Sequence, residues 1–266
     1  MKKNIIFAVL VLVCYFFNIL LGLAASVAFI AYLLYHHLPD IYMLKGTRAY
    51  GMKDTQKALY WYKRGIKTGR ASVKGKIYYA IMLLRCGFPD DAERYLNTAI
   101  NTPAATPQEK VFAKPFRILT YLKQGRIQEA TEDLDELFDE VKNSATYGLK
   151  GYFMLLMGAN ADDTLTLCKE AYDYNSSDRD IMDNLALAYI KSEMYDEADE
   201  LLTEIREKFP TFTEGVFHSA LLAHKTGDSD KAKQYLAELD NCDRTYLTSV
   251  SLDEIDELKQ EVGFNA

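Results

Sequence analysis

The sequence predicts an all-α protein: an N-terminal transmembrane helix, an α-solenoid of about six helix pairs and a C-terminal capping helix. Two observations support this fold class. Residues 5–35 form a long apolar run without a charged side chain. Small residues recur with gaps of 34, 38, 34, 34 and 34 residues, at Ala58, Ala92, Ala130, Thr164, Ala198 and Ala232. A period near 34 is typical of solenoids in which each helix pair buries its apolar face against its neighbours.

The apolar run is long enough to cross a membrane. Nineteen of the 31 residues in 5–35 are Leu, Ile, Val or Phe, and a spanning helix needs about 20 apolar residues. One long span is the leading interpretation. The alternative is a re-entrant hairpin bent near residues 18–22, with limbs of roughly 20 Å at the α-helical rise. A cleavable signal peptide is disfavoured, because the apolar run continues beyond the small residues at 24–26.

Basic residues after the run predict its orientation. Asp54 is the only acid among a membrane-proximal basic patch that consists of Lys45, Arg48, Lys53, Lys57, Lys63, Arg64, Lys67, Arg70, Lys74 and Lys76. Because basic flanks stay on the cytoplasmic side, we expect a single-pass protein of the cell membrane with its repeats facing the cytoplasm. The lipid bilayer is therefore an expected partner, and the patch has two possible explanations. It contacts anionic lipid headgroups, or it is present only because basic residues flank a membrane segment on its cytoplasmic side.

The clearest repeat unit covers residues 179–212. Apolar residues spaced three and four apart mark one face of each of its two expected helices, and these residues are Leu185, Ala186, Tyr189, Ala198, Leu202 and Ile205. Ala186 and Ala198 fall where the two helices approach, and a larger side chain there would overpack by roughly 1–3 kcal/mol. Pro210 ends the second helix. This pattern resembles the tetratricopeptide repeat (TPR). The first helix of that motif has an apolar residue, a small residue and a Tyr, and its second helix has an Ala, then aromatic or aliphatic positions, then a Pro.

The resemblance covers residues 39–246 and implies six repeats. Their expected boundaries are 39–72, 73–106, 111–144, 145–178, 179–212 and 213–246, with residues 1–38 as the membrane anchor and 247–266 as a capping helix and tail. The segment 102–110, rich in Pro, Thr and Ala, is interpreted as a longer loop. Four glycines are expected in left-handed turns between paired helices: Gly87, Gly125, Gly158 and Gly227. Leu252, Ile255, Leu258 and Val262 share the apolar face of the expected capping helix.

The resemblance also implies a partner-binding groove, because the first helix of each TPR lines a concave surface. By register, its lining comprises Ile77, Ile81, Leu84, Arg85, Leu119, Leu122, Lys123, Tyr152, Leu155, Leu187, Ile190, Lys191, Phe217, Leu221 and Lys225. The four basic members, Arg85, Lys123, Lys191 and Lys225, recur at the same repeat position, near the end of a first helix. They form either a row that grips an amphipathic helix or acidic peptide, or ordinary cations at helix C-termini. The family's Lys/Asn clamp for a carboxylate is not evident, since Asp180 and Asp183 occupy inner positions.

Composition argues against several other classes of function. Residues 86–266 hold 36 acidic and 18 basic residues, which disfavours nucleic acid as a partner. The four cysteines lie far apart without a Cys-x-x-Cys pair, and no His-Glu-x-x-His or phosphate-binding loop occurs. We therefore expect no enzymatic activity, no cofactor and no metal.

These expectations lead to one function and two alternatives. The leading hypothesis is a non-catalytic, membrane-anchored TPR scaffold or adaptor that binds protein or peptide partners through the concave groove. The first alternative is a membrane-shaping protein with a re-entrant hairpin anchor and self-associating repeats. The second is an accessory subunit of a membrane enzyme complex.

Overall fold

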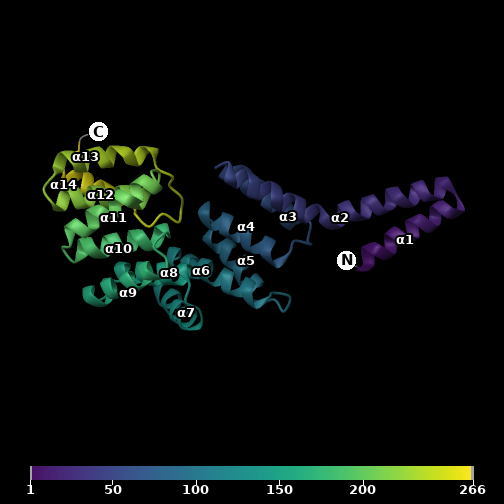
Figure 1. Cartoon of the computed structure of the whole chain (residues 1–266), viewed down its shortest axis with the longest axis horizontal. Helices are drawn as coiled ribbons and strands as arrows, with labels where there is room; N and C mark the ends of the chain where they lie inside the picture. Colours follow the sequence, from purple (N-terminus) through teal and green to yellow (C-terminus); the bar gives the residue numbers. More distant parts are fainter. Residues whose placement is uncertain (1, 265–266) are drawn as a thin grey trace.

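A computed structural model of the chain describes residues 2–264. Within this range the protein is built of α-helices and one 3-10 turn, without a β-strand (Figure 1). The helices are α1 (Lys2–Phe17), α2 (Ile19–Gly51), α3 (Thr55–Lys67), α4 (Val73–Arg85), α5 (Pro89–Asn101), α6 (Pro107–Lys123), α7 (Ile127–Glu140), α8 (Ser144–Leu156), α9 (Ala161–Tyr174), α10 (Arg179–Lys191), α11 (Tyr195–Lys208), α12 (Thr213–Lys225), α13 (Ser229–Glu238) and α14 (Leu252–Glu261), with the 3-10 turn η1 (Leu239–Asn241) after α13.

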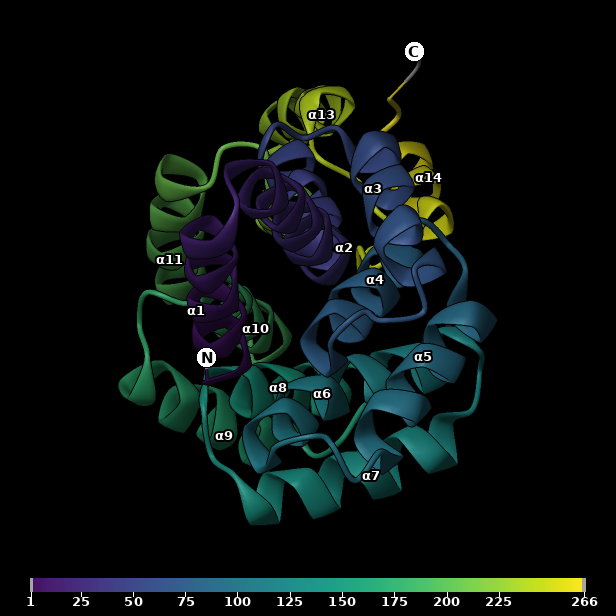
Figure 2. The ribbon, with the colours of Figure 1, turned by 90° about the vertical axis from the view of Figure 1, so that its right-hand side faces the viewer.

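From α3 onward the helices form a curved solenoid. Each helix contacts the next, and the first helices of successive pairs, α4, α6, α8, α10 and α12, also contact one another. In the end-on view of Figure 2, helices α5, α7, α9 and α11 form the outer ring and α4, α6, α8 and α10 the inner one. The concave surface therefore belongs to the first helix of each pair, as the TPR resemblance implies.

The small residues that define the period lie in the core between paired helices. Ala58, Ala92, Ala130, Ala198 and Ala232 have no exposed surface, and Thr164 is 4% exposed. Burial at these points lets the two helices of a pair approach closely, which explains why the sequence keeps small side chains there.

The turns between paired helices confirm the expected glycines. Gly87, Gly125, Gly158 and Gly227 have φ angles between +62° and +84°. This left-handed region costs glycine little and other residues more. In two other turns Lys53 and Glu193 take the same conformation, with φ of 60° and 59°.

The longer loop expected at 102–110 is shorter in the structure. Helix α6 begins at Pro107, and Thr106 caps it in a reciprocal capping box with Glu109. Proline is favoured at this first helical position, since its missing N–H has no partner there in any case. The extra residues of this unit therefore lengthen α6, and only residues 102–106 form the connection.

The helix expected to run unbroken over residues 5–35 is interrupted at Asn18. This residue is extended (φ −161°, ψ 132°), and its side chain accepts a hydrogen bond from the N–H of Leu20 at 2.8 Å. Asparagine favours such N-cap positions because its side chain satisfies N–H groups that lack a helical partner. Helix α1 turns back along α2, with the rings of Phe7 and Tyr32 stacked at 5.0 Å. The structure therefore has a helical hairpin bent within the region named by the alternative interpretation, while α2 alone keeps the length expected of a spanning helix.

Helix α2 joins this hairpin to the solenoid without a linker. It runs from Ile19 to Gly51, so residue 38, the expected end of the anchor, lies inside the helix. Only 6% of its most apolar 18-residue stretch is buried, which distinguishes it from a core helix. Its second half packs on α3, where Gly46 lies against the ring of Tyr62. Helix α2 is apolar and long enough to cross a membrane, and it is also the first helix of the first pair.

The solenoid ends in α14, which covers the apolar face of the last pair. Ile255, Leu258 and Val262 are buried in one cluster with Leu236 and Leu239. This helix begins at the expected residue, and a capping box between Ser251 and Glu254 fixes its start. Leu252 is 65% exposed, so it does not belong to the buried face that was expected.

Candidate functional site

The apolar residues predicted to line the groove fall into two groups by burial. Half-buried members that reach the surface are Ile81, Leu119, Tyr152, Leu187 and Leu221. Fully buried members are Ile77, Leu84, Leu122, Leu155, Ile190 and Phe217. The second group packs in the hydrophobic clusters between helices. These residues support the concave surface from below, and only the first group is open to a partner.

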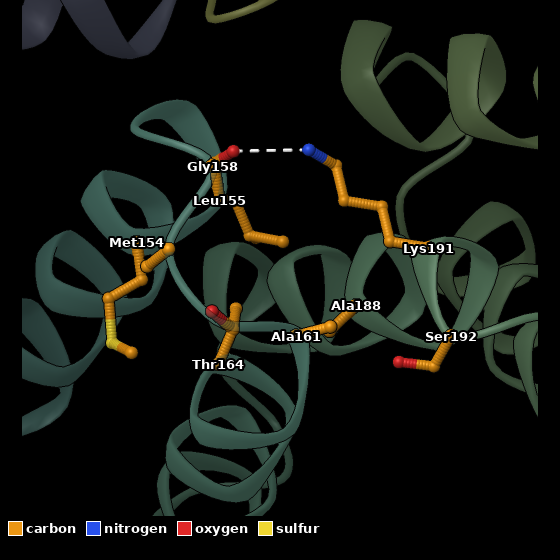
Figure 3. Close-up of a pocket in the computed structure, with 9 residues that line it drawn as sticks. Met154, Leu155, Gly158, Ala161, Thr164, Ala188, Lys191 and Ser192 are labelled. Carbon is orange, nitrogen blue, oxygen red and sulfur yellow. Dashed lines mark hydrogen bonds between the residues drawn. The ribbon is translucent and has the colours of Figure 1, made fainter.

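Among the basic row, Lys191 connects two neighbouring first helices. Its Nζ donates a hydrogen bond to the carbonyl oxygen of Leu155 at 3.1 Å, across a cavity of about 90 Å³ (Figure 3). Leu155 lies in the last turn of α8, where carbonyl groups lack a helical partner. Lys191 therefore caps the adjacent helix; both Lys191 and Lys225, at the end of α12, are exposed.

Arg85 and Lys123 contact a segment from the other end of the chain. We name residues 243–250, which connect η1 to α14, the inner segment. The N–H of Tyr246 donates to the carbonyl of Arg85 at 3.3 Å, and its hydroxyl donates to the carbonyl of Lys123 at 3.3 Å. The Nζ of Lys123 donates in turn to the carbonyl of Thr248 at 3.1 Å. Figure 1 shows the loop between α13 and α14 reaching toward α4.

The inner segment is also held at its two ends. The carboxylate of Asp243 accepts hydrogen bonds from Lys53 at 2.7 Å and from the hydroxyl of Thr211 at 2.8 Å. Near the other end, Oε1 of Glu214 accepts a hydrogen bond from the N–H of Ser249 at 2.8 Å. The segment thus links the last helix pair to the turn of the first pair and to α4 and α6.

Ionisable side chains gather beneath the inner segment. Burial raises the pKa of the Glu214 carboxyl, although the Ser249 N–H opposes this effect. Burial lowers the pKa of Lys123 despite the nearby carboxylates of Glu214 and Glu254. Burial and the same two carboxylates raise the pKa of Tyr152 to about 12. The floor of the concave surface is therefore partly dehydrated and rich in carboxylates.

Two further members of this interior form a buried pair. Nδ1 of His218 lies 2.8 Å from Oδ1 of Asp183, and the residues are 5% exposed each. Asp183 was expected at an inner position, but its pairing with His218 was missed. The 35-residue separation, close to one repeat, is the signal that could have revealed it, because equal register positions of adjacent repeats lie side by side.

The inner segment was also missed. Residues 243–250 cross the expected boundary between the last repeat, which ends at residue 246, and the capping segment, which begins at residue 247. Its composition was a signal that could have revealed it. The segment contains Tyr, Leu, Val, two Thr and one Ser, whereas a solvated linker is typically rich in Gly, Pro and charged residues.

Most of the membrane-proximal basic patch is exposed beside aromatic rings. Eight of its ten members are exposed, and Arg70 and Lys76 are half-buried. The Nζ of Lys45 lies 4.5 Å from the ring centroid of Trp61, which stacks on Tyr42 at 5.8 Å. The guanidinium of Arg70 lies 3.4 Å from the ring centroid of Tyr35. The patch is therefore a mixed cationic and aromatic surface at the base of the hairpin.

Within residues 2–264 no three His, Cys, Asp or Glu side chains are grouped as metal ligands would be. Burial raises the pKa of the Cys168 thiol to about 12, which keeps it protonated and unreactive near neutral pH. The described site offers hydrogen-bonding groups and half-buried apolar residues, which suit binding.

Fold and surface together define a class of protein, the helix-pair solenoid with a concave surface lined by first helices. A family model described as tetratricopeptide repeat matches residues 180–211. The chain thus carries a TPR in its fifth helix pair, and its fold is that of TPR proteins. A comparison with curated protein sequences finds no match.

Three solved structures illustrate the fold. A tetratricopeptide repeat protein from Parabacteroides merdae aligns with a TM-score of 0.64 and 13% identity, over 97% of this chain and 98% of that one. A chain of the APC/C hetero-tetramer Cut9–Hcn1 gives 0.65 and 16%, over 86% and 45%. PilF of Pseudomonas aeruginosa gives 0.56 and 17%, over 84% and 97%. At these identities the likeness shows the fold alone.

Proposed function

We propose that this protein is a non-catalytic, membrane-anchored TPR scaffold or adaptor that binds a protein or peptide partner through its concave surface. One observation carries the proposal: α2 is both a limb of the apolar hairpin and the first helix of the solenoid. A continuous helix transmits the orientation of the anchor to the repeats. Anchoring then raises the effective concentration of any partner that also visits the membrane.

The dimensions of the hairpin favour insertion from one side of the bilayer. The apolar part of α1, Ile5–Phe17, is about 20 Å long, and residues 19–35 of α2 extend about 26 Å at the α-helical rise. The hydrocarbon core of a bilayer is about 30 Å thick. The apolar part of α1 is therefore too short to cross on its own, and α1 packs against α2, so we infer that both limbs enter and leave on the same face. Basic residues near both ends of the hairpin support the cytoplasmic side of the cell membrane as that face.

The aromatic and basic side chains at the base of the hairpin support this depth. Tyr and Trp are enriched at the interface between bilayer and water, where their rings lie among headgroups. Tyr42 and Trp61, with Lys45 above the indole ring, match such an interface. Basic residues close to an anionic surface add about 1 kcal/mol each to membrane attraction.

Cysteine labelling tests the topology of the anchor. In the full chain with its native cysteines replaced, Asn4→Cys and Lys225→Cys are introduced separately, and intact cells are treated with a membrane-impermeant maleimide. We expect both to react only after permeabilisation. Labelling of Asn4→Cys from outside, with Lys225→Cys protected, would establish a single span and overturn the hairpin anchor.

Site-specific photo-crosslinking tests partner binding. A photoreactive amino acid replaces Lys191 or Lys225 at the edge of the concave surface, or Glu132 or Glu200 on exposed positions of the second helices α7 and α11. In native membranes we expect discrete adducts from the first pair of positions and none from the second. Adducts restricted to the second pair would contradict a concave binding site. Mass spectrometry of the adducts identifies the partner.

The hairpin itself favours a second candidate function, shaping of the membrane. A wedge inserted into one leaflet expands that leaflet and bends the bilayer. Full-length protein reconstituted at increasing density would then narrow vesicles or form tubules in electron micrographs. Vesicles of unchanged diameter at high protein density would leave anchoring as the role of the hairpin.

A further inference from the structure

The path of the inner segment, residues 243–250, is longer than the fold requires. Helices α12, α13 and α14 pack in one hydrophobic cluster, so the end of η1 at Asn241 and the start of α14 at Leu252 belong to the same small unit. Connections between packed helices usually need about 2–8 residues. This chain uses the ten residues from 242 to 251 and carries them away from the unit, to α4 and α6.

The contacts of the inner segment resemble those of a bound extended peptide. It has no helix or strand of its own, and it is held largely through its backbone. Tyr246 N–H donates to the carbonyl of Arg85, Thr248 C=O accepts from Lys123, and Ser249 N–H donates to Glu214. Main-chain hydrogen bonds of this kind give affinity in peptide recognition, and pockets for individual side chains give specificity.

Two side chains of the inner segment occupy defined positions. Leu247 packs against the cluster that contains Tyr79, Met82 and Leu83 of the second helix pair. The ring of Tyr246 lies over Gly87, where a Cβ atom would be 3.5 Å from the ring, and Lys123 Nζ is 5.7 Å from the ring centroid. The receiving site therefore takes an aromatic residue followed by an aliphatic one.

Residues 243–249 of the inner segment are positioned to leave without unfolding the solenoid, whereas Val250, which is 4% exposed, belongs to the buried cluster of α12, α13 and α14 and stays there. Tyr246 remains 39% exposed, and the bond between Lys53 and Asp243 joins side chains that are 72% and 56% exposed. Segments with few buried apolar contacts and exposed hydrogen bonds open locally far more often than the core does. The capping helix α14 keeps its own buried face during such an opening, because that face packs on α12 and α13.

We propose that residues 243–249 of the inner segment are a built-in ligand that covers part of the concave surface, and that an extended segment of a partner protein binds there by displacing them. This inference rests on the proposed function, since it names the site and the chemistry of the partner. The fitting segment is uncharged at its centre, with an aromatic and then an aliphatic residue, and it offers a carbonyl group to Lys123 and an N–H group to Glu214. The inner segment thus reduces binding of weaker or incorrect peptides.

A peptide-binding experiment in trans tests the inference. The probe is a fluorescent peptide with the sequence of residues 243–250, and the protein is the full chain in nanodiscs. In the variant Tyr246→Gly/Leu247→Gly the built-in ligand is weakened, and we expect the peptide to bind at least tenfold more tightly than to the wild type. Adding Lys123→Met to this variant should abolish the gain. Equal binding to wild type and variant, or binding to neither, overturns the inference.

Two controls separate folding from occupancy. Tyr174→Gly alters an exposed aromatic residue elsewhere (54% exposed) and should leave peptide binding as weak as in the wild type. If the double variant does not fold, hydrogen exchange of the wild type tests whether the inner segment opens independently of the solenoid core. We expect the amides of Tyr246 and Ser249 to exchange at least 100-fold faster than those of Leu185 and Ala186 in the core of α10. Exchange of all four at one rate would make the inner segment a permanent structural part and overturn the inference.

The two experiments fail independently. Adducts at Lys191 or Lys225 in native membranes without peptide binding to the opened variant would retain the scaffold function and reject the built-in ligand. Peptide binding without any adduct would retain the built-in ligand and reject a partner at this surface in those membranes.

Discussion

Nδ1 of His218 on α12 lies 2.8 Å from Oδ1 of Asp183 on α10, and the two residues belong to adjacent first helices. Both side chains are almost completely buried. A buried carboxylate is costly without a partner, and a buried imidazole also needs one. The pair therefore ties the fifth helix pair to the sixth at the floor of the concave surface.

This pair predicts a stability that depends on pH. Burial alone lowers the pKa of His218, but the charge of Asp183 and its hydrogen bond outweigh it, with smaller contributions from Glu214 and Glu254, so the folded pKa lies above the ordinary 6.5. Because the folded state holds the proton more tightly, its stabilisation is complete below about pH 6.5. That stabilisation is lost as the pH rises through the folded pKa.

Melting of the detergent-solubilised full chain between pH 5.5 and 8.5 measures this effect. We expect the melting temperature to fall across the upper part of this range, and to fall less in His218→Gln. Parallel profiles for the two proteins would mean that His218 does not carry the dependence.

Removing the charge of Asp183 tests how much the pair with His218 contributes to the free energy of unfolding. Asp183→Asn leaves the imidazole with a weaker acceptor, and we expect a loss of about 1–3 kcal/mol in the free energy of unfolding. Asp180→Asn is the matched control on the same helix, because Asp180 is exposed and paired only with Arg179 at the surface. Its cost should remain within about 0.5 kcal/mol. Equal effects of the two substitutions in denaturant titrations would contradict a stabilising role for the pair.

The small residues that recur once per repeat predict positions at which the solenoid cannot accommodate a larger side chain. Ala232 on α13 has no exposed surface, so Ala232→Leu forces the last helix pair apart and should cost about 1–3 kcal/mol. Ala237, five residues on in the same helix, is exposed, and Ala237→Leu should change stability by about 0.5 kcal/mol or less. Chemical denaturation of both variants measures the difference. A tolerated leucine at 232 alone would show that this position is not a close-packing point.

The helix pairs were predictable from sequence because the interactions that form them are local and repeated. Ala130 and Ala198 mark close approaches within a pair, and Gly125 marks a left-handed turn; each acts within one unit of chain. The burial of Ile77 and Leu84 could not be predicted from register alone. A first helix packs on both its own partner and the neighbouring first helices, so part of its inner face is core.

Two other features of the structure, the position of the inner segment and the hairpin at the N-terminus, could not be predicted from the repeat period. The contact between Lys123 and Thr248 joins residues 125 positions apart, and no local pattern encodes a pairing at that distance. The break at Asn18 results from one polar side chain that caps a helix within a long apolar run. Average hydrophobicity favours continuation of the helix there, whereas the cap and the packing of α1 on α2 favour the turn.

The hairpin depends on a close approach between Gly22 on α2 and Tyr15 on α1. A Cβ atom at Gly22 would lie 2.3 Å from Cγ of Tyr15, at the root of the ring, so a ring rotation cannot relieve the clash. Small residues allow such approaches between helices in lipid, and Ser26, one turn further on, donates a hydrogen bond to the Tyr15 hydroxyl at 3.2 Å. Gly22→Ala should therefore separate α1 from α2.

Spin labels on Leu10→Cys and Val27→Cys, which are 53% and 67% exposed in the wild type, report the separation of the two limbs in nanodiscs after the native cysteines are replaced. We expect a short, narrow distance distribution in this background and a longer, broader one after Gly22→Ala. Gly51→Ala is the matched control on the same helix, because a Cβ atom there meets nothing within 4 Å, and it should leave the distribution unchanged. A narrow, unshifted distribution in Gly22→Ala would show that the limbs do not depend on this contact, and a broad distribution in all three proteins would show that they do not pair in the membrane.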